Sequence, residues 1–198
     1  MKKLIILSIL ICGLYSYSQE SNYGISIGVS ASGISNDSQN TSGDVTAPKG
    51  VGFIISGFYE YNINDRFGLI GNLNFNKKIV NYDPPKAKLS YLELNPMIKF
   101  DVNGNYGNGF YLKTGLNYSL LLAAKENETN QDIKNDFNNS LLGFNFGFGS
   151  DISKIIGVEF IFGYSFSNSL KEIENQKIKS NILSGYLSVV IDINELIK

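Results

Sequence analysis

Apolar residues recur at every second position along most of the chain beyond residue 20, and this period-two pattern constrains the fold more than any other feature. In residues 67–76, the odd-numbered positions hold Phe, Leu, Gly, Leu and Phe, whereas the even-numbered positions hold Gly, Ile and three Asn. Successive side chains of a strand point to opposite faces, so such a segment has one apolar face and one small or polar face. Helical spacing is scarcely visible, and the sequence therefore predicts an all-β fold.

Eight segments carry this alternation, and seven of them are ten or eleven residues long, close to the roughly nine to eleven residues that a tilted strand needs to cross a bilayer. They lie at residues 23–32, 51–61, 67–76, 91–100, 110–120, 142–149, 156–166 and 183–193. The connections at 62–66, 101–108 and 151–155 are short, whereas those at 34–50, 77–88, 123–140 and 167–180 are longer, polar and charged. Short periplasmic turns that alternate with long outer loops are typical of outer-membrane proteins. We therefore predict an eight-stranded antiparallel up-and-down transmembrane β-barrel.

The charges within the predicted strands all fall on the small and polar face. They are Glu60, Glu93, Lys99, Lys113 and Glu159. Because a Lys or Arg on the lipid side at the bilayer midplane costs about 2–4 kcal/mol, this distribution favours apolar faces that contact lipid. The Gly, Ser and Asn of the opposite face fit the crowded interior of a small barrel. The alternative is a soluble exported β-sandwich, which would bury its apolar face and expose many Lys and Glu.

The N-terminus has the pattern of a secretory signal peptide. Two lysines precede an apolar run at residues 4–14, and serines occupy the −3 and −1 positions of a cut after Ser18. We expect residues 1–18 to be removed and residues 19–198 to form a barrel domain in the bacterial outer membrane. Cys12 suggests a lipoprotein, but Ile11 stands where a lipobox needs a small residue. Cys12 is therefore interpreted as part of the signal core.

The composition excludes several kinds of catalytic site. The chain has no histidine, and its one cysteine is Cys12. Without histidine there is no Ser/His/Asp or Cys/His arrangement and no usual zinc site, and a mature chain without a thiol has no iron–sulfur ligation. The formal net charge of −1 argues against a nucleic-acid partner. We expect no catalytic, cofactor-binding or metal-binding residues, and a barrel enzyme acting on lipids or peptides is a disfavoured alternative.

Three local patterns are weaker candidates for binding sites. Residues 101–105 superficially resemble a calcium loop, but Tyr106 and Leu112 replace its glycine and glutamate, so a turn built on Asn103 and Gly104 is expected. The glycines at 143, 147 and 149 precede no helix and are interpreted as interior-facing small residues. The acids of the 125–136 segment are expected to be solvated, with a divalent-cation site as the alternative. These acids are Glu126, Glu128, Asp132 and Asp136.

Two strands and the glycine-alternating segment give the chain a resemblance to a known family. Residues 91–100, YLELNPMIKF, look like the "YLEIPLLLKY" strand of PorT-like outer-membrane β-barrel proteins, and residues 109–115, GFYLKTG, resemble the strand that follows it. Residues 143–149 are similar to the sixth strand of that family. The resemblance covers most of the mature chain. It implies a barrel fold and an outer-membrane location, and it brings no active-site residues.

The five strand charges are the candidate site, as a network inside the lumen. We expect Glu60, Lys99, Lys113 and Glu159 near the periplasmic half, where they neutralise one another because buried charges must be paired. Conduction of protons or ions is the alternative interpretation of the same charges.

The function that these observations favour is a structural, adhesion or binding role through the outer loops. A narrow channel or transport accessory for small solutes, and a soluble exported β-sandwich binding module, are the alternatives from other classes. The expected partners are outer-membrane lipid and lipopolysaccharide, together with an envelope protein bound through the loops.

Overall fold

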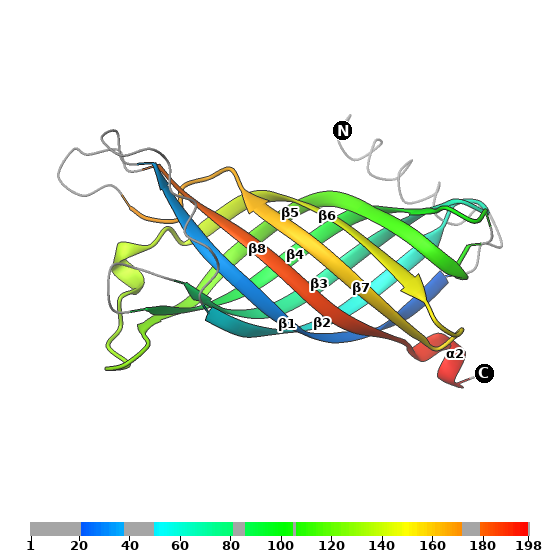
Figure 1. Cartoon of the computed structure of the whole chain (residues 1–198), viewed down its shortest axis with the longest axis horizontal. Coiled ribbons are helices and arrows are strands. Elements are labelled where there is room, and N and C mark those ends of the chain that lie inside the picture. Colours follow the sequence, from blue (N-terminus) through cyan, green and yellow to red (C-terminus); the bar gives the residue numbers. More distant parts are fainter. Residues whose placement is uncertain (1–20, 38–49, 81–85, 105, 172–178, 198) are drawn as a thin grey trace, which may run out of the picture.

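The computed structural model describes residues 21–37, 50–80, 86–104, 106–171 and 179–197, and these residues form a closed barrel of eight strands. In Figure 1 the short turns and the C-terminal helix lie at one end, and the connection between β5 and β6 lies at the opposite end. The strands are β1 (Ser21–Asp37), β2 (Gly50–Asn62), β3 (Phe67–Val80), β4 (Ala87–Asp101), β5 (Gly109–Glu126), β6 (Ser140–Asp151), β7 (Ile156–Ser165) and β8 (Lys179–Asp192). A 3-10 helix, η1 (Lys134–Asp136), lies between β5 and β6, and α2 (Ile193–Ile197) follows β8. We call the end with the short turns the turn end and the opposite end the outer end.

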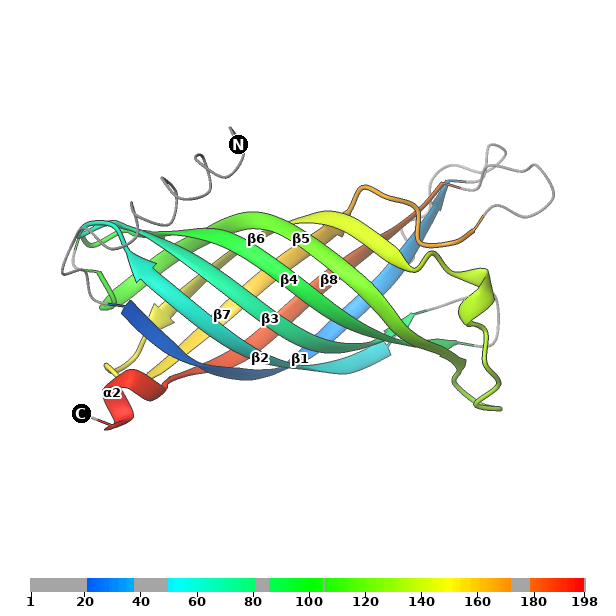
Figure 2. The same ribbon diagram turned by 180° about the vertical axis from the view of Figure 1, so that it is seen from behind.

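Each strand pairs antiparallel with its neighbours in the sequence, and β1 also pairs with β8 to close the barrel. Ile25 of β1, for example, lies opposite Gly57 of β2 on one side and Ile191 of β8 on the other. The view from behind in Figure 2 shows the wall continuing around the molecule. The predicted up-and-down barrel is confirmed, and the β-sandwich alternative is wrong because a single sheet closes on itself.

Seven of the eight strands are longer than predicted, with most of the extra residues at the outer end, and β7 is one residue shorter because it ends at Ser165. β3 continues to Val80, β4 begins at Ala87 and β5 ends at Glu126. Residues 77–80 and 87–88 of the loop predicted at 77–88 are therefore strand, and the prediction was wrong for these residues. The alternation of faces continues through these residues, but the outward side chains include Lys77 and Lys88, so the apolar signature of the strand is lost.

The last predicted strand ends one residue early. Ile193, which alternation assigned to the strand, begins α2. The cause is local: the Asp192 carboxylate accepts a hydrogen bond from the backbone N–H of Glu195 at 3.0 Å, as a helix N-cap does.

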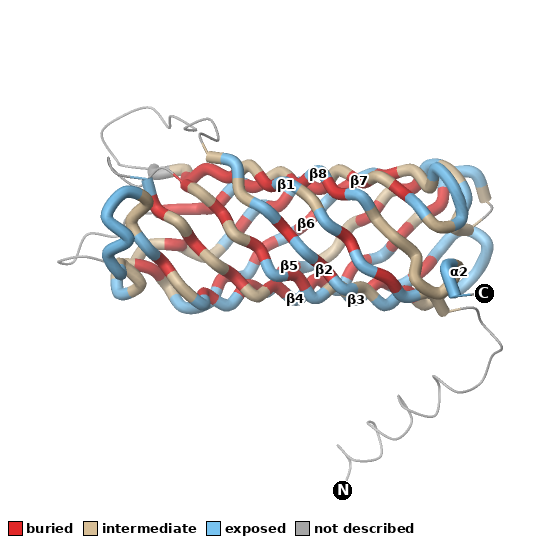
Figure 3. The backbone as a smooth tube through the Cα atoms, turned by 90° about the horizontal axis from the view of Figure 1, so that it is seen from below, coloured by how far each residue is buried: buried red, intermediate tan, exposed pale blue. Residues whose placement is uncertain are grey.

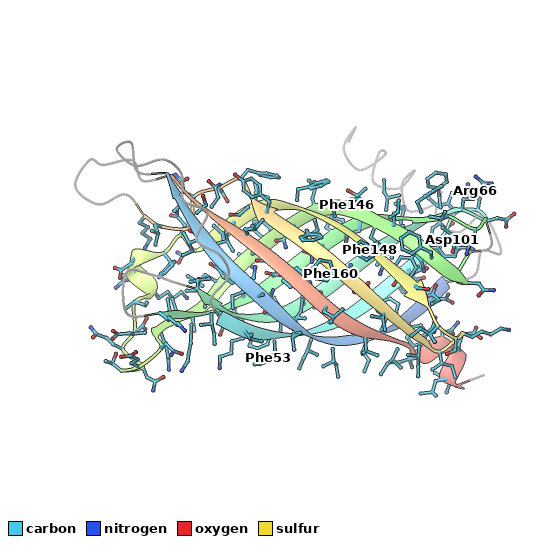
Figure 4. The ribbon with its side chains drawn as sticks, in the orientation of Figure 1. Phe53, Arg66, Asp101, Phe146, Phe148 and Phe160 are labelled. Carbon is cyan, nitrogen blue, oxygen red and sulfur yellow. The ribbon has the colours of Figure 1, made fainter. Side chains whose placement is uncertain are left out.

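The apolar faces of the strands point outward, as predicted. Leu116 is 57% exposed, whereas the next residue, Asn117, is 7% exposed. Figure 3 shows buried and exposed residues alternating along the strands. Figure 4 shows Phe146 and Phe148 on the wall, and the rings of Phe148 and Phe160 lie 5.8 Å apart. A continuous apolar outer wall of this kind suits lipid as its surroundings.

The interior of the barrel is tightly packed around Gly147 of β6. A Cβ added to Gly147 would lie 2.6 Å from the carbonyl oxygen of Phe160 and 2.7 Å from Cγ1 of Ile161. Because the backbone must shift to admit a methyl group, Gly147→Ala should lower the free energy of unfolding by about 1–3 kcal/mol, measured by urea unfolding in lipid vesicles. Gly57 faces outward with nothing within 4 Å of an added Cβ, so Gly57→Ala is the matched control. Equal losses in the two variants would contradict the steric explanation.

An apolar core fills the barrel at the outer end. Phe137, from the connection between β5 and β6, is 0% exposed and forms an isolated β-bridge with Leu170, which follows β7. Ile133 and Leu170 pack against this core. The described parts of these two connections are thus held over the barrel mouth by apolar contacts. The buried members of the core are Ile34, Val80, Ala87, Leu89, Tyr91, Leu121, Ala124, Phe137, Leu141 and Ile182.

Candidate functional site

The charged residues of the lumen form two groups, and the larger group lies toward the turn end. Lys113 Nζ of β5 is 2.6 Å from Glu159 Oε2 of β7. Lys99 Nζ of β4 is 3.2 Å from Glu60 Oε1 of β2 and 3.6 Å from Asp151 Oδ2 at the end of β6. Lys99 and Lys113 lie directly opposite each other in the register of β4 and β5. Since like charges in this arrangement repel, the acids on either side are needed to stabilise it.

Two tyrosine rings lie against these lysines. Lys99 Nζ is 4.9 Å from the centre of the Tyr106 ring and 4.4 Å from that of Tyr111, and Lys113 Nζ is 5.0 Å from the Tyr111 ring. Cation–π contacts of this kind stabilise ammonium groups that are removed from water. Tyr106 belongs to the turn between β4 and β5, and Gly68 leaves the space that its hydroxyl occupies. Burial, and then the nearby Glu60 carboxylate, raise the pKa of the Tyr106 phenol, which therefore stays neutral.

Glu93 forms the second group with a partner that the sequence did not predict. Lys78 Nζ lies 2.8 Å from Glu93 Oε1, and both side chains are almost fully buried. Asn76 Nδ2 donates to the two carboxylate oxygens at 3.3 and 3.4 Å, and the Ser119 hydroxyl donates to Oε1 at 3.5 Å. Lys78 lies in a segment predicted as loop. Continuing the inward series of Asn74 and Asn76 by two residues would have found it.

The five predicted residues are therefore divided between two places. Glu60, Lys99, Lys113 and Glu159 lie together toward the turn end, and Glu93 lies apart from them with Lys78. Sequence reasoning missed Lys78 and also Asp151, because Asp151 was assigned to a turn and its contact with Lys99 spans the intervening strand β5.

A cavity of ≈ 550 Å³ lies beside the larger group at the turn end. Glu60, Lys99, Lys113 and Tyr111 contribute to its wall, and Lys154 comes from the turn between β6 and β7. The two buried lysines of this wall are paired with carboxylates. Each ion pair links two strands that are separated by one other strand, and the arrangement presents no nucleophile held by a general base.

The segment that resembles a calcium loop is a turn. The Asp101 carboxylate accepts a hydrogen bond from the backbone N–H of Asn103 at 3.1 Å, and Gly104 has a φ of 66°. Figure 4 shows Asp101 and Arg66 near the same end of the barrel, and the N–H of Asp101 donates to the Arg66 carbonyl at 2.7 Å. These bonds use the Asp101 carboxylate and backbone to shape the turn.

Two acids at the connection between β5 and β6 accept hydrogen bonds from nearby residues of the same segment. The Asp132 carboxylate accepts a hydrogen bond from the backbone N–H of Lys134 at 2.9 Å, and the Glu126 carboxylate accepts one from the Thr129 hydroxyl. Within the described ranges, no cluster of three or more acidic or sulfur side chains could hold a metal ion. No helix of the described residues is long and apolar enough to cross a membrane.

A closed barrel of eight antiparallel strands, with an apolar wall and paired charges inside, defines the class of small outer-membrane β-barrel proteins. The sequence agrees with this class. Residues 17–171 match the family described as outer membrane protein beta-barrel domain, and the chain belongs to that family. The outer membrane is the location of such domains, as expected.

Solved bacterial barrels share the fold. The chain is similar to Ail, the attachment invasion locus protein of Yersinia pestis, with a TM-score of 0.52 and 14% identity over 87% of this chain and 99% of that one. Ail has also been crystallised with the heparin analogue sucrose octasulfate. Neisserial surface protein A gives a TM-score of 0.52 and 14% identity over 87% and 98% of the two chains. At these identities the likeness concerns the fold, and a comparison with curated proteins finds no match.

The PorT-like assignment and the signal peptide both stay predictions. The matching family supports an outer-membrane barrel, and the narrower PorT-like assignment stays a prediction. The signal peptide at 1–18, with Cys12 inside it, lies outside the described residues.

Proposed function

We propose that the chain is a non-enzymatic outer-membrane protein, exported by its N-terminal signal, that binds an extracellular partner through the closed outer end of its barrel. The observation that carries this proposal is the apolar core in which Phe137 and Leu170 hold two connections over the barrel mouth. β1 and β5 have 17 and 18 residues, more than the roughly nine to eleven that cross a bilayer, so this end stands above the lipid. A packed platform loses less conformational entropy on binding than free loops do.

Attachment of cells that display the protein tests this function. Heparin-coated surfaces are the first probe, because Ail, which has the same fold, was crystallised with a heparin analogue. Gln131, Asn135 and Asn139 are exposed in the connection between β5 and β6, and replacing all three by serine should remove most of the attachment. Wild-type cells that attach no better than cells without the protein would contradict the proposal.

A matched triple variant controls for folding and for the number of substitutions. Asp65, Asn108 and Lys154 are exposed in the turns at the opposite end of the barrel. Their replacement by serine should leave attachment unchanged. Equal losses in the two triple variants would mean that the outer end is not the binding surface.

A channel or transport accessory is the second candidate, favoured by the cavity of ≈ 550 Å³ at the turn end. Beyond that cavity the lumen contains the buried Lys78–Glu93 pair and then the apolar core. We therefore expect planar bilayers with the protein to show no steady conductance above protein-free bilayers. A conductance that is lost when Lys99 and Lys113 are both replaced by glutamine would identify the protein as a channel.

A further inference from the structure

Three lysines project outward on neighbouring strands at the outer end of the wall. They are Lys77 of β3, Lys88 of β4 and Lys125 of β5, called the rim lysines here. Lys88 lies directly opposite Lys125, and Lys77 lies opposite Ser90, two residues along β4 from Lys88. Cβ atoms in directly opposite positions are about 5 Å apart, and those in diagonal positions about 7–8 Å. The register therefore gathers three ammonium groups into one patch.

A fourth lysine lies beside this patch. Lys134 Nζ donates a hydrogen bond to the carbonyl oxygen of Leu122 on β5 at 3.1 Å. Lys88 Nζ donates to the carbonyl oxygen of Asn127, also at 3.1 Å. Each bond uses one of the three donors of an ammonium group, so donors remain for a ligand.

The rim lysines differ from the lysines of the lumen in having no acidic partner. Lys78, Lys99 and Lys113 each lie within 3.6 Å of a carboxylate oxygen. Among the described residues, no carboxylate forms an ion pair with a rim lysine or with Lys134. An arrangement of unneutralised like charges in direct register destabilises a sheet, so an external anion would stabilise it.

Among the described residues, two acids close in sequence to Lys125 and Lys134 accept hydrogen bonds from other groups. Asp132 forms an isolated bridge with Lys125, but its carboxylate accepts the backbone N–H of Lys134. Glu126 lies opposite the buried Ala87, and its carboxylate accepts the Thr129 hydroxyl. Neither carboxylate lies within ion-pair distance of a rim lysine.

The patch lies near the outer limit of the lipid-facing apolar residues, where Ile79 of β3 lies opposite Lys88. Phe75 is the outward residue that precedes Lys77, and Leu92 is the large apolar residue before Ser90 and Lys88 on β4. Lys77 Nζ lies 5.9 Å from the centre of the exposed Phe53 ring, so its stem covers apolar surface while its charge reaches outward. Side chains at this level meet the headgroup layer, where the anions are lipid phosphates.

We propose that the rim lysines, together with Lys134, bind the phosphate groups of the lipid anchor of lipopolysaccharide in the outer leaflet. Phosphate oxygens accept charge-assisted hydrogen bonds from several ammonium groups at once. Such a contact fixes the height and rotation of the barrel in the leaflet. The inference rests on the outer-membrane orientation in the proposed function, and it does not depend on which partner the outer end binds.

Binding of purified lipid A to the barrel in neutral phosphatidylcholine nanodiscs tests this site. Bisphosphorylated lipid A should bind, and dephosphorylated lipid A should bind at least about tenfold more weakly. The double variant Lys88→Gln with Lys125→Gln should bind bisphosphorylated lipid A more weakly than the wild type by a similar factor. Arg66→Gln with Lys154→Gln removes two exposed cations at the turn end and should change the affinity by less than about twofold.

Three outcomes would overturn the proposal. The first is equal affinity of the barrel for the two forms of lipid A. The second is an equal loss of lipid A affinity in the two double variants. The third is heparin binding that requires Lys88 and Lys125 while lipid A binding does not. The last result would make the patch a site for sulfated polysaccharide. Heat-dependent gel mobility should show that both double variants fold. Lys88→Gln with Lys125→Gln should leave cell attachment unchanged. That result would show that the lysine patch and the outer-end binding surface are distinct sites.

Discussion

Glu159→Gln should destabilise the folded barrel by about 3–5 kcal/mol, because it leaves the ammonium group of Lys113 buried without its carboxylate. Lys113 Nζ is 2.6 Å from Glu159 Oε2, and the two side chains are 7% and 9% exposed. Lys99 lies directly opposite Lys113, so the remaining charge also faces a like charge in register. Urea unfolding in phospholipid vesicles, followed by heat-dependent gel mobility, measures the loss.

A double variant separates the cost of an unpaired charge from the value of the pair. Lys113→Met with Glu159→Leu removes both charges, and it should recover most of the stability lost in Glu159→Gln because buried ion pairs are often replaceable by apolar residues. Lys154→Gln, at an exposed position, is the surface control and should change stability by less than about 0.5 kcal/mol. The pairing argument fails if Glu159→Gln unfolds at the same urea concentration as the wild type.

The faces of the strands could be predicted from the sequence because alternation is a local property of an extended chain. The outward Leu116 and the inward Asn117 follow directly from that period. The placement of Glu60, Lys99, Lys113 and Glu159 toward one end followed from their positions within strands of known direction. These inferences needed no knowledge of which side chains touch.

The contacts between strands that are not direct neighbours could not be predicted in the same way. Asp151 of β6 approaches Lys99 of β4 across the intervening β5, and that distance depends on the stagger and curvature of the three strands. Tyr106 reaches Lys99 because its turn folds over the barrel end and Gly68 leaves space for the hydroxyl. Alternation carries no information on either distance.

Lys78 is a different case, because the information was present in the sequence. Residues 74, 76 and 78 continue one inward series, and Lys78 pairs with Glu93. The strand was ended too early because its outward positions stop being apolar at Lys77. Outside the membrane, strands no longer need an apolar outer face, so the end of the apolar pattern marks the lipid boundary rather than the end of the strand.

Leu116→Arg should destabilise the barrel in a bilayer by about 2–4 kcal/mol, since it places a charge on the lipid side near the midplane. Leu116 is 57% exposed and lies midway along the outward series of β5, which runs from Phe110 to Leu122. In a water-exposed sheet the same substitution at so open a position would be nearly neutral. Urea unfolding in vesicles, with Leu116→Ala as the reference for lost side-chain contacts, isolates the cost of the charge.

Phe110→Arg is the control for depth in the bilayer, because it places the same charge on the same strand but near the edge of the membrane. Phe110 is also exposed on the outer wall, at 42%, but it lies at the turn end of β5, where an arginine can reach the polar interface. Its charge should cost only about 0–1 kcal/mol relative to Phe110→Ala. A steep difference between the two positions requires a low-dielectric layer around the middle of the barrel, whereas equal costs at 110 and 116 would mean that the apolar wall is covered by something other than a bilayer.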